Sequence, residues 1–375
     1  MDNSQVKLEA AYRDLLREHG VDQLVQPLEY AEESFEAIKA AGWYDEAGIS
    51  KKEAHKQLVE TSNNMTYIYN PLLSVLASDV ENDITLRGAE LPCHVFVGGF
   101  PMGESNACIM PHCDGAIVLF NHGLKQLIYQ VGKVFILSYD WLICATNKAG
   151  DLRIDIDTEG ADSAMNTASA ILRWKPCGWT VDKSVDALAD IVNSYKTHGS
   201  LVGTPRQPLP EGERALTFAR ILYNAEKFVV AHEYAHLLLG HCHGPLTTLR
   251  TPAGVLKGVV PQRQEHELQA DELATSLLLA SADWHSPDGE FDSNCRVAGI
   301  ALFFVSAILL NAALYGPIGV GFDAPPCDSH PAPNARMLKI LEFVQNRYGR
   351  SYSYLARLCM GWLFANFEGG LAEFL

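Results

Sequence analysis

No charged residue occurs between Val297 and Phe322, and most side chains in this run are apolar. A helix of such length and composition is stable only inside a protein core or across a bilayer, which takes roughly 20 apolar residues to span. Asn311 interrupts the run, Gly316-Pro317 break it, and no cluster of Lys or Arg flanks it as an orientation signal. These features favour a buried core helix, with a membrane span at 297–315 as the alternative.

The charge balance and the cysteines restrict the partners and the compartment of the chain. Lysine and arginine number 29, and aspartate and glutamate 45, so the formal net charge is −16. A chain this acidic lacks the basic surface that nucleic-acid phosphates or anionic lipids attract, so we expect no nucleic-acid partner. The nine cysteines are scattered without a CxxC pair, and the charged N-terminus has no apolar signal segment. These features predict free thiols in a reducing compartment, the cytoplasm.

Hydrophobic periodicity predicts an α+β fold that is mainly helical and contains a small sheet. Helical spacing extends over 183–196, 213–239 and 264–281. The segments AIVLF (116–120) and KVFILS (133–138) have the composition of strands.

A Pro- and Gly-rich stretch at 199–213 is the predicted linker of the chain. It divides the sequence into an N-terminal helical and mixed region, 1–205, of unknown role, and a C-terminal region, 206–375. The two regions can still form one compact unit.

The helix predicted at 213–239 carries HEYAH from His232 to His236. Residues four apart lie on one helical face, so both imidazoles can reach one zinc ion. Glu233 would then lie beside the metal, where it can accept a proton from a zinc-bound water. The flanking segments FVVA and LLLG indicate a buried helix, in which three ionisable side chains need a charged partner. Two ordinary histidines on a structural helix are the alternative.

A catalytic zinc needs a third protein ligand and an open position for water. The pattern HExxHxxGxxH would take this ligand from the position of Cys242, but Leu239 stands in place of its glycine. A later segment, EHELQAD, offers Glu267 and Asp271 one helical turn apart. Glu267 can bind the ion while Asp271 orients a histidine ligand. An exposed acidic turn is the alternative interpretation.

A third segment, DSHPAPNAR, places His330 and Arg336 around a helix start predicted at Pro333. Both side chains are donors that could face the oxyanion of a tetrahedral intermediate. Two alternatives stay open: His330 is an ordinary surface histidine, or Arg336 pairs with Asp271 or Glu267 and acts on stability.

These three segments, in this order, resemble the gluzincin metallopeptidases of the CAAX prenyl-protease and HtpX type. That family combines HExxH, a helix of pattern ExxADxxA and an SHP loop followed by an arginine. The chain has HEYAH, ELQADELA (267–274) and SHPAPNAR (329–336), within residues 220–340. The soluble, intracellular Lit-like phage-exclusion peptidases are most similar in character, since the chain lacks paired membrane helices.

The resemblance implies a zincin-like metallopeptidase core, in which the HExxH helix packs beside the ExxAD helix, and a role for each matching residue. The implied zinc ligands are His232, His236 and Glu267; Asp271 lies behind the ligands, and the catalytic residues are Glu233, His330 and Arg336.

Other histidines and cysteines form weaker patterns. A second metal site made of Cys108, His112, Cys113 and His122 lacks CxxC spacing. The residues directly after the HExxH helix, 241–243, are expected to cap it or to line the cleft, with one of them as a zinc ligand as the alternative.

The sequence therefore predicts a zinc metallopeptidase, a hydrolase that cleaves peptide bonds of a protein or peptide substrate. An extended substrate would add to an exposed strand edge, for which AIVLF is the predicted strand. One alternative is a non-catalytic, zinc-stabilised interaction protein, which would not need Glu233. Another is an integral-membrane metalloprotease that uses 297–315 as its span.

Overall fold

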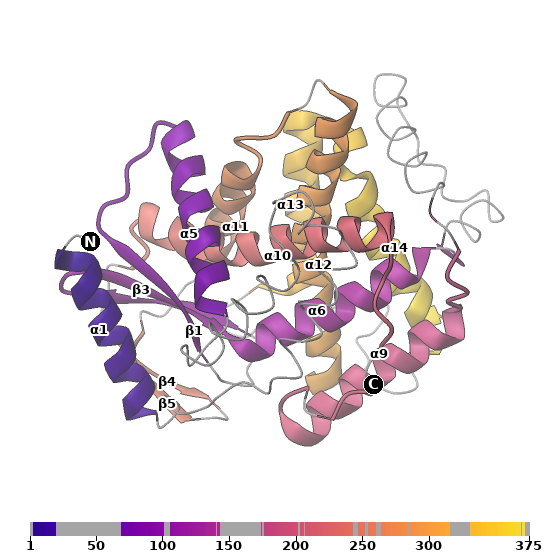
Figure 1. Ribbon diagram of the computed structural model, residues 1–375, viewed down its shortest axis with the longest axis horizontal. Coiled ribbons are helices and arrows are strands. Elements are labelled where there is room, and N and C mark those ends of the chain that lie inside the picture. Colours follow the sequence, from indigo (N-terminus) through magenta and orange to yellow (C-terminus); the bar gives the residue numbers. More distant parts are fainter. Residues whose placement is uncertain are drawn as a thin grey trace, which may run out of the picture.

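Helices make up most of the computed structural model, and a small sheet lies at one side of them (Figure 1). The helices and strands are α1 (Asn3–Glu18), α5 (Tyr69–Leu86), β1 (Val95–Phe100), β2 (Ala107–His112), β3 (Gly115–Asn121), α6 (His122–Leu137), α9 (Val181–His198), α10 (Glu213–Leu238), β4 (Thr247–Thr251), β5 (Gly254–Val259), α11 (Gln264–Leu278), α12 (Pro287–Tyr315), α13 (Pro333–Tyr348), the 3₁₀ turn η1 (Arg350–Ser353) and α14 (Tyr354–Glu368). The structure describes residues 3–19, 69–100, 106–139, 141–142, 174, 176–201, 203–205, 207–242, 247–251, 254–259, 264–283, 286–315, 331–368 and 370–371. The predicted fold class, α+β and mainly helical, is confirmed.

Two long helices, α10 and α12, lie against each other and bring most other helices together. α11 packs against α10, and α13 and α14 pack against α12. Side chains of α12 such as Ile300 and Phe304 are fully buried. The apolar core extends from Leu73 of α5 to Leu371, so it contains residues from both sides of position 205.

The predicted core helix is α12, which extends further toward the N-terminus than the charge-free run. Among the described residues one helix, Asp288–Leu314, is long and apolar enough to cross a membrane. In the fold, 72% of the most apolar 18-residue stretch of this helix is buried inside the protein. The described part of α12 extends to Tyr315, and the predicted break at Gly316-Pro317 lies outside the described residues.

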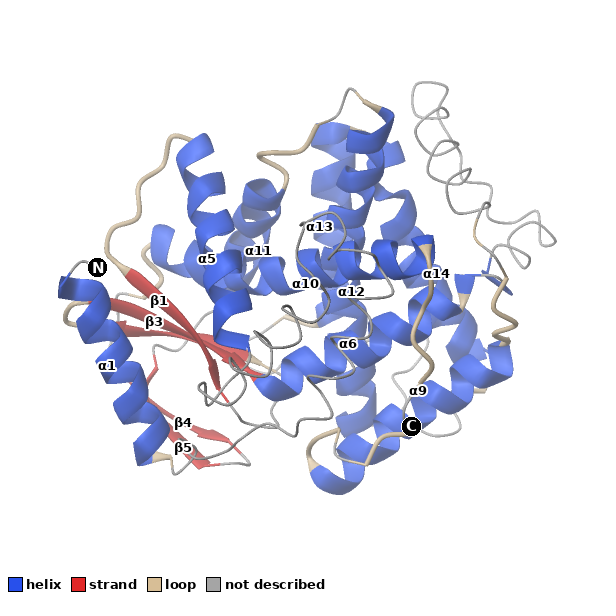
Figure 2. Cartoon of the chain, in the orientation of Figure 1, coloured by secondary structure: helices blue, strands red, loops and turns tan. Residues whose placement is uncertain are grey.

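A three-stranded sheet of order β1-β3-β2 lies beside the helices (Figure 2). β1 runs parallel to β3, with Val97 opposite Val118, and β2 runs antiparallel to β3, with Ile109 opposite Val118. β1 and β2 are therefore the edges of this sheet. β4 and β5 form a separate antiparallel hairpin, whose β5 lies near β2.

The sheet separates two apolar clusters, because successive side chains of a strand point to opposite faces. Leu119 of β3 packs on one face with Leu8 and Tyr12 of α1. Val118, the preceding residue of the same strand, belongs to the main helical core. The hydroxyl of Tyr12 also donates a hydrogen bond of 2.6 Å to the carbonyl of Gly99, which ties α1 to β1.

The segment AIVLF lies in β3 and is a strand, as predicted. The strand predicted at KVFILS is wrong, because residues 133–137 form the last part of α6. Val134, Phe135 and Ile136 are all buried. A short apolar run such as 134–137 fits a buried helix as well as a buried strand, so its composition does not distinguish the two.

Gly299 of α12 lies so close to α10 that a side chain there has no room. A Cβ on Gly299 would lie 2.7 Å from the backbone nitrogen of Ala225 and 2.8 Å from Cβ of Asn224. We expect Gly299→Ala to force the helices apart and to lower the free energy of unfolding by about 1–3 kcal/mol, measured by urea denaturation.

The matched control is Gly361→Ala in α14, where a Cβ would meet nothing within 4 Å. This change should raise the free energy of unfolding by about 0.5–1 kcal/mol, because alanine favours the helix over glycine. Equal stability of Gly299→Ala and the wild-type chain would contradict the close packing of α10 on α12.

Candidate active site

His232 and His236 lie one turn apart on α10 and point at the same spot. Their Nε2 atoms are 3.1 Å apart, and both side chains are buried. Glu267 of α11 completes the group, with one carboxylate oxygen 3.4 Å from His232 Nε2 and the other 3.4 Å from His236 Nε2. The structure therefore brings together the three residues predicted as metal ligands.

The spacing of these atoms fits a tetrahedral metal ion. The three ligand atoms lie within 4.8 Å of one another. Ligands held 2.0–2.1 Å from a tetrahedral zinc are themselves about 3.3 Å apart, close to the distances between His232, His236 and Glu267. This buried group can hold a metal ion.

Asp271 and Arg336 lie directly behind the ligand group. Asp271 Oδ1 is 3.0 Å from His232 Nδ1, the ring nitrogen that faces away from His236. Arg336 of α13 donates two hydrogen bonds of 2.7 Å to the Asp271 carboxylate, and its Nη1 is 3.2 Å from Glu267. Asp271 therefore occupies the predicted orienting position.

The protonation of the group depends on this balance of charges. Burial opposes the charge on Glu267, but the contact with His232 and the charge of Arg336 outweigh it and hold the carboxyl pKa far below its ordinary value. Burial would lower the pKa of His232, yet Asp271 and Glu267 raise it to about 10. Burial lowers the pKa of His236 to about 4. The two carboxylates thus require a positive charge here, which a proton or a metal ion can supply.

Glu233 lies beside the ligand group and has the properties of a proton acceptor. It is buried, and burial together with the charge of Glu267 raises its pKa to about 7 against the opposing charges of His232 and Arg336. The backbone N–H of Ile109 lies near it and slightly favours the charged form of the carboxyl group, which lowers its pKa. A carboxyl group with a pKa near neutrality can both accept and return a proton at physiological pH.

Strand β2 is the edge strand that lies next to Glu233. The N–H of Asn121 donates a hydrogen bond to the carbonyl of Asn106, so these two residues form a hydrogen-bonded pair of the β2–β3 ladder. Such pairs alternate with pairs whose backbone groups point outward, and Ile109, three residues later, therefore directs its backbone groups away from β3. The prediction that AIVLF forms the exposed edge is wrong, because β3 is paired on both sides. Pairing order is a non-local property that strand composition does not carry.

Ile109 was not identified from the sequence, and no local signal could have found it. Its contribution is a backbone N–H, which every residue except proline possesses. Only the position of β2 beside α10 gives that group a role.

The contacts of Arg336 agree with the alternative in which this residue pairs with Asp271 or Glu267 and acts on stability. Its guanidinium is buried and is bound to both Asp271 and Glu267. His330 lies outside the described residues.

The histidine and cysteine that follow α10 have different surroundings. His241 Nδ1 is 3.0 Å from His236 Nδ1, so His241 contacts a predicted ligand on the side away from Glu267. Cys242 is buried, and burial raises its thiol pKa to about 12. Cys242 does not belong to the buried group of His232, His236 and Glu267.

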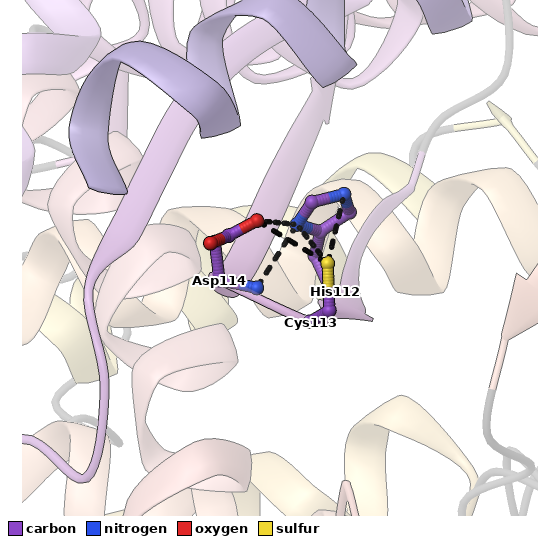
Figure 3. A group of neighbouring side chains, drawn as sticks. All are labelled: His112, Cys113 and Asp114. Atoms are coloured by element: carbon purple, nitrogen blue, oxygen red, sulfur yellow. Dashed lines mark hydrogen bonds and ion pairs between the residues drawn. The ribbon is translucent and has the colours of Figure 1, made fainter. Parts of the chain in front are cut away.

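A second group of possible ligands lies at the turn between β2 and β3 (Figure 3). It consists of His112, Cys113 and Asp114, and does not include Cys108. His112 and Cys113 are exposed. Lys7 already neutralises the carboxylate of Asp114 from 2.8 Å. A cation would have to compete with this lysine, unlike at the buried group.

We expect Glu267→Ala to lower the affinity for zinc strongly, because it removes one of three ligands, whereas Cys242→Ser should leave the affinity unchanged. Glu272→Ala, which alters an exposed glutamate of the same helix, is the control. Metal analysis after dialysis against a chelator measures the difference. Zinc lost from Cys242→Ser but retained by Glu267→Ala would reverse the assignment.

Residues 180–353 match the model of a family described as Peptidase U49. The matched segment runs from the residue before α9 to the end of η1 and contains the metal-ligand group, Glu233 and Arg336. No curated protein and no solved structure matches the chain. The match supports a peptidase family for this chain, and with it a proteolytic function.

Proposed function

We propose that the chain is a zinc-dependent endopeptidase with a zincin-like core built by α10 and α11. The observation that carries this proposal is the buried group of His232, His236 and Glu267 at tetrahedral spacing, with Glu233 beside it. Two histidines and one carboxylate leave one position of a tetrahedron open, as catalytic zinc sites do and closed structural sites do not.

Each residue of the group then has a defined part in peptide hydrolysis. A bound zinc ion supplies Lewis acidity, which polarises the scissile carbonyl and makes water nucleophilic near neutral pH. Glu233 accepts the proton of the attacking water and transfers it to the leaving amine as the C–N bond breaks. The raised pKa of Glu233, about 7, suits both steps. Arg336 and Asp271 hold the ligands in place from behind.

We propose that the substrate is a protein or peptide that binds as an extended strand along β2. The outward backbone groups of Ile109 lie next to Glu233, so a strand added there would bring a peptide bond to the metal group. Pro111 has no N–H to offer to such a strand, so pairing would weaken toward the end of β2.

The order of motifs supports a more specific relation to the CAAX prenyl-protease and HtpX gluzincins, with soluble Lit-like peptidases as the nearest in character. The family match to a peptidase is consistent with it. The seven cysteines that the structure describes are all free, which supports a reducing compartment such as the cytoplasm. The burial of α12 supports a core helix rather than a membrane span.

A purely structural zinc site would explain the three ligands but not Glu233. Burying a carboxyl group without a strong partner costs free energy, and Glu233 is buried with one backbone donor. A role as general base explains why a carboxyl group is buried at this position, whereas a structural zinc site does not require one.

Glu233→Gln should abolish cleavage of a protein substrate while zinc stays bound, because the change removes the proton acceptor and preserves size. The variant also tests the substrate: mixed with cell extract, it should retain the protein that the wild-type chain cleaves. Glu272→Gln is the control, since this glutamate is exposed on α11. Unchanged cleavage by the Glu233→Gln variant would remove Glu233 from the mechanism.

Arg336 and His330 should differ in what their loss affects. Arg336→Lys keeps the charge but cannot reproduce the bidentate contact with Asp271, so zinc affinity and thermal stability should fall together.

His330→Ala should keep zinc and lower turnover about 100- to 1,000-fold, as loss of an oxyanion donor does. Steady-state kinetics on zinc-loaded protein separates the two, and wild-type turnover of the His330 variant would end its proposed role.

A further inference from the structure

His236 can bind a metal through Nε2 only if its proton is on Nδ1. That Nδ1 is buried and lies 3.0 Å from Nδ1 of His241. The other nitrogen of His241, Nε2, lies 3.1 Å from the side-chain oxygen of Gln269, and the amide nitrogen of Gln269 donates to Glu265 at 3.3 Å. A chain of hydrogen bonds therefore runs from an exposed carboxylate on α11 to a ligand on α10.

The carboxylate of Glu265 fixes the direction of every donor in this chain. An ionised carboxylate only accepts, so the amide of Gln269 presents its nitrogen to Glu265 and its oxygen to His241. That oxygen also only accepts, so His241 carries its proton on Nε2 and has a free lone pair on Nδ1. His236 must then donate from Nδ1, which leaves its Nε2 unprotonated and facing His232 and Glu267.

The reverse arrangement fails at two places. If His241 donated from Nδ1, its neutral ring would turn an unprotonated Nε2 toward the oxygen of Gln269, two acceptors 3.1 Å apart. His236 would then carry its proton on Nε2, where the Glu267 carboxylate at 3.4 Å could accept it but where the proton would occupy the position of the metal. The arrangement with the proton of His236 on Nδ1 therefore satisfies the contact between His241 and Gln269 and leaves Nε2 of His236 able to bind a cation.

The end of α10 is built to place His241 there. Gly240 has φ +72°, a left-handed conformation that glycine adopts without strain, and His241 N–H bonds to the carbonyl of His236 at 2.9 Å. This helix end turns His241 back over the last turn of α10. His266 of α11 stacks on its ring, with centroids 4.1 Å apart and planes 8° from parallel.

We propose that His241 and Gln269 are positioning residues that hold the proton of His236 on Nδ1 and so direct its Nε2 lone pair at the metal. The proposal rests on the metal site of the proposed function and adds two residues to it. Asp271 lies on the corresponding side of His232, with its Oδ1 3.0 Å from Nδ1. Partners of this kind fix the orientation of metal-binding histidines, and their loss weakens metal affinity about 10- to 100-fold.

Zinc affinity of the full chain, measured by competition with a chromogenic chelator, tests the proposal. His241→Phe and Gln269→Leu should each weaken zinc binding about 10- to 100-fold. Gln264→Leu alters an exposed glutamine of the same helix and should bind zinc as the wild-type chain does. Wild-type affinity of His241→Phe would overturn the proposal.

A rescue variant distinguishes the hydrogen bond from mere packing. Asparagine places a side-chain oxygen where histidine has Nδ1, so His241→Asn keeps an acceptor for His236 but loses the stacked ring. Positioning by hydrogen bonding predicts tighter zinc binding by the Asn variant than by the Phe variant. A packing role predicts the opposite order, and that order would overturn the proposal.

The proton on His236 can also be located without metal or activity. Two-bond ¹H–¹⁵N correlations of ¹⁵N-histidine-labelled, zinc-free chain should show His236 protonated on Nδ1, and this preference should be lost in His241→Phe. Protonation on Nε2 in the wild-type chain would overturn the proposal while leaving the metal site intact. The expected tautomer without any zinc binding would instead overturn the proposed function, and with it the purpose of these residues.

Discussion

Two carboxylates one turn apart on α11 have to be compensated inside the protein, and the arrangement of the surrounding helices follows from that. Glu267 and Asp271 are each at most 2% exposed, and burying an ion without partners costs several kcal/mol. Arg336 of α13 contacts both carboxylates from one side, and His232 contacts both from the other. One guanidinium leaves one negative charge unbalanced, so the α10 side must supply a positive charge. That is why the group fits a metal ion better than it fits two neutral imidazoles alone.

The parts of the fold that could be predicted are those that short stretches of sequence specify. α9 begins where the side chain of Thr180 accepts a hydrogen bond from Lys183 N–H and ends at Gly199 in a left-handed conformation, both recognisable signals. The ligand group was predictable for a similar reason, because two pairs at i and i+4, on α10 and on α11, are readable without knowing the fold. The contact between those pairs, 31 residues apart from His236 to Glu267, was one of two interpretations of the second segment, and the resemblance favoured it.

What the sequence did not predict depends on which elements become neighbours. The end of α6 was predicted as a strand because a short run of apolar side chains fits either element. Lys133, although charged, is also buried there. The edge strand was assigned to AIVLF, since strand order is not encoded in any one strand. The role proposed for Ile109 uses its backbone, and the role proposed for His241 depends on how α10 ends. Neither has a signature in residue type.

Helix α11 ties both histidines of the candidate site to a single structural element. Within five residues it supplies Glu267 to both Nε2 atoms, Gln269 to His236 by way of His241, and Asp271 to Nδ1 of His232. A shift of α11 by one residue along α10 would turn each of these side chains by about 100° about the helix axis and break all three contacts together. The metal binding and general-base chemistry proposed for α10 therefore depend on how α11 packs, and Arg336 contacts α11 from the side away from α10. The site is thus a property of three packed helices rather than of the HExxH motif alone.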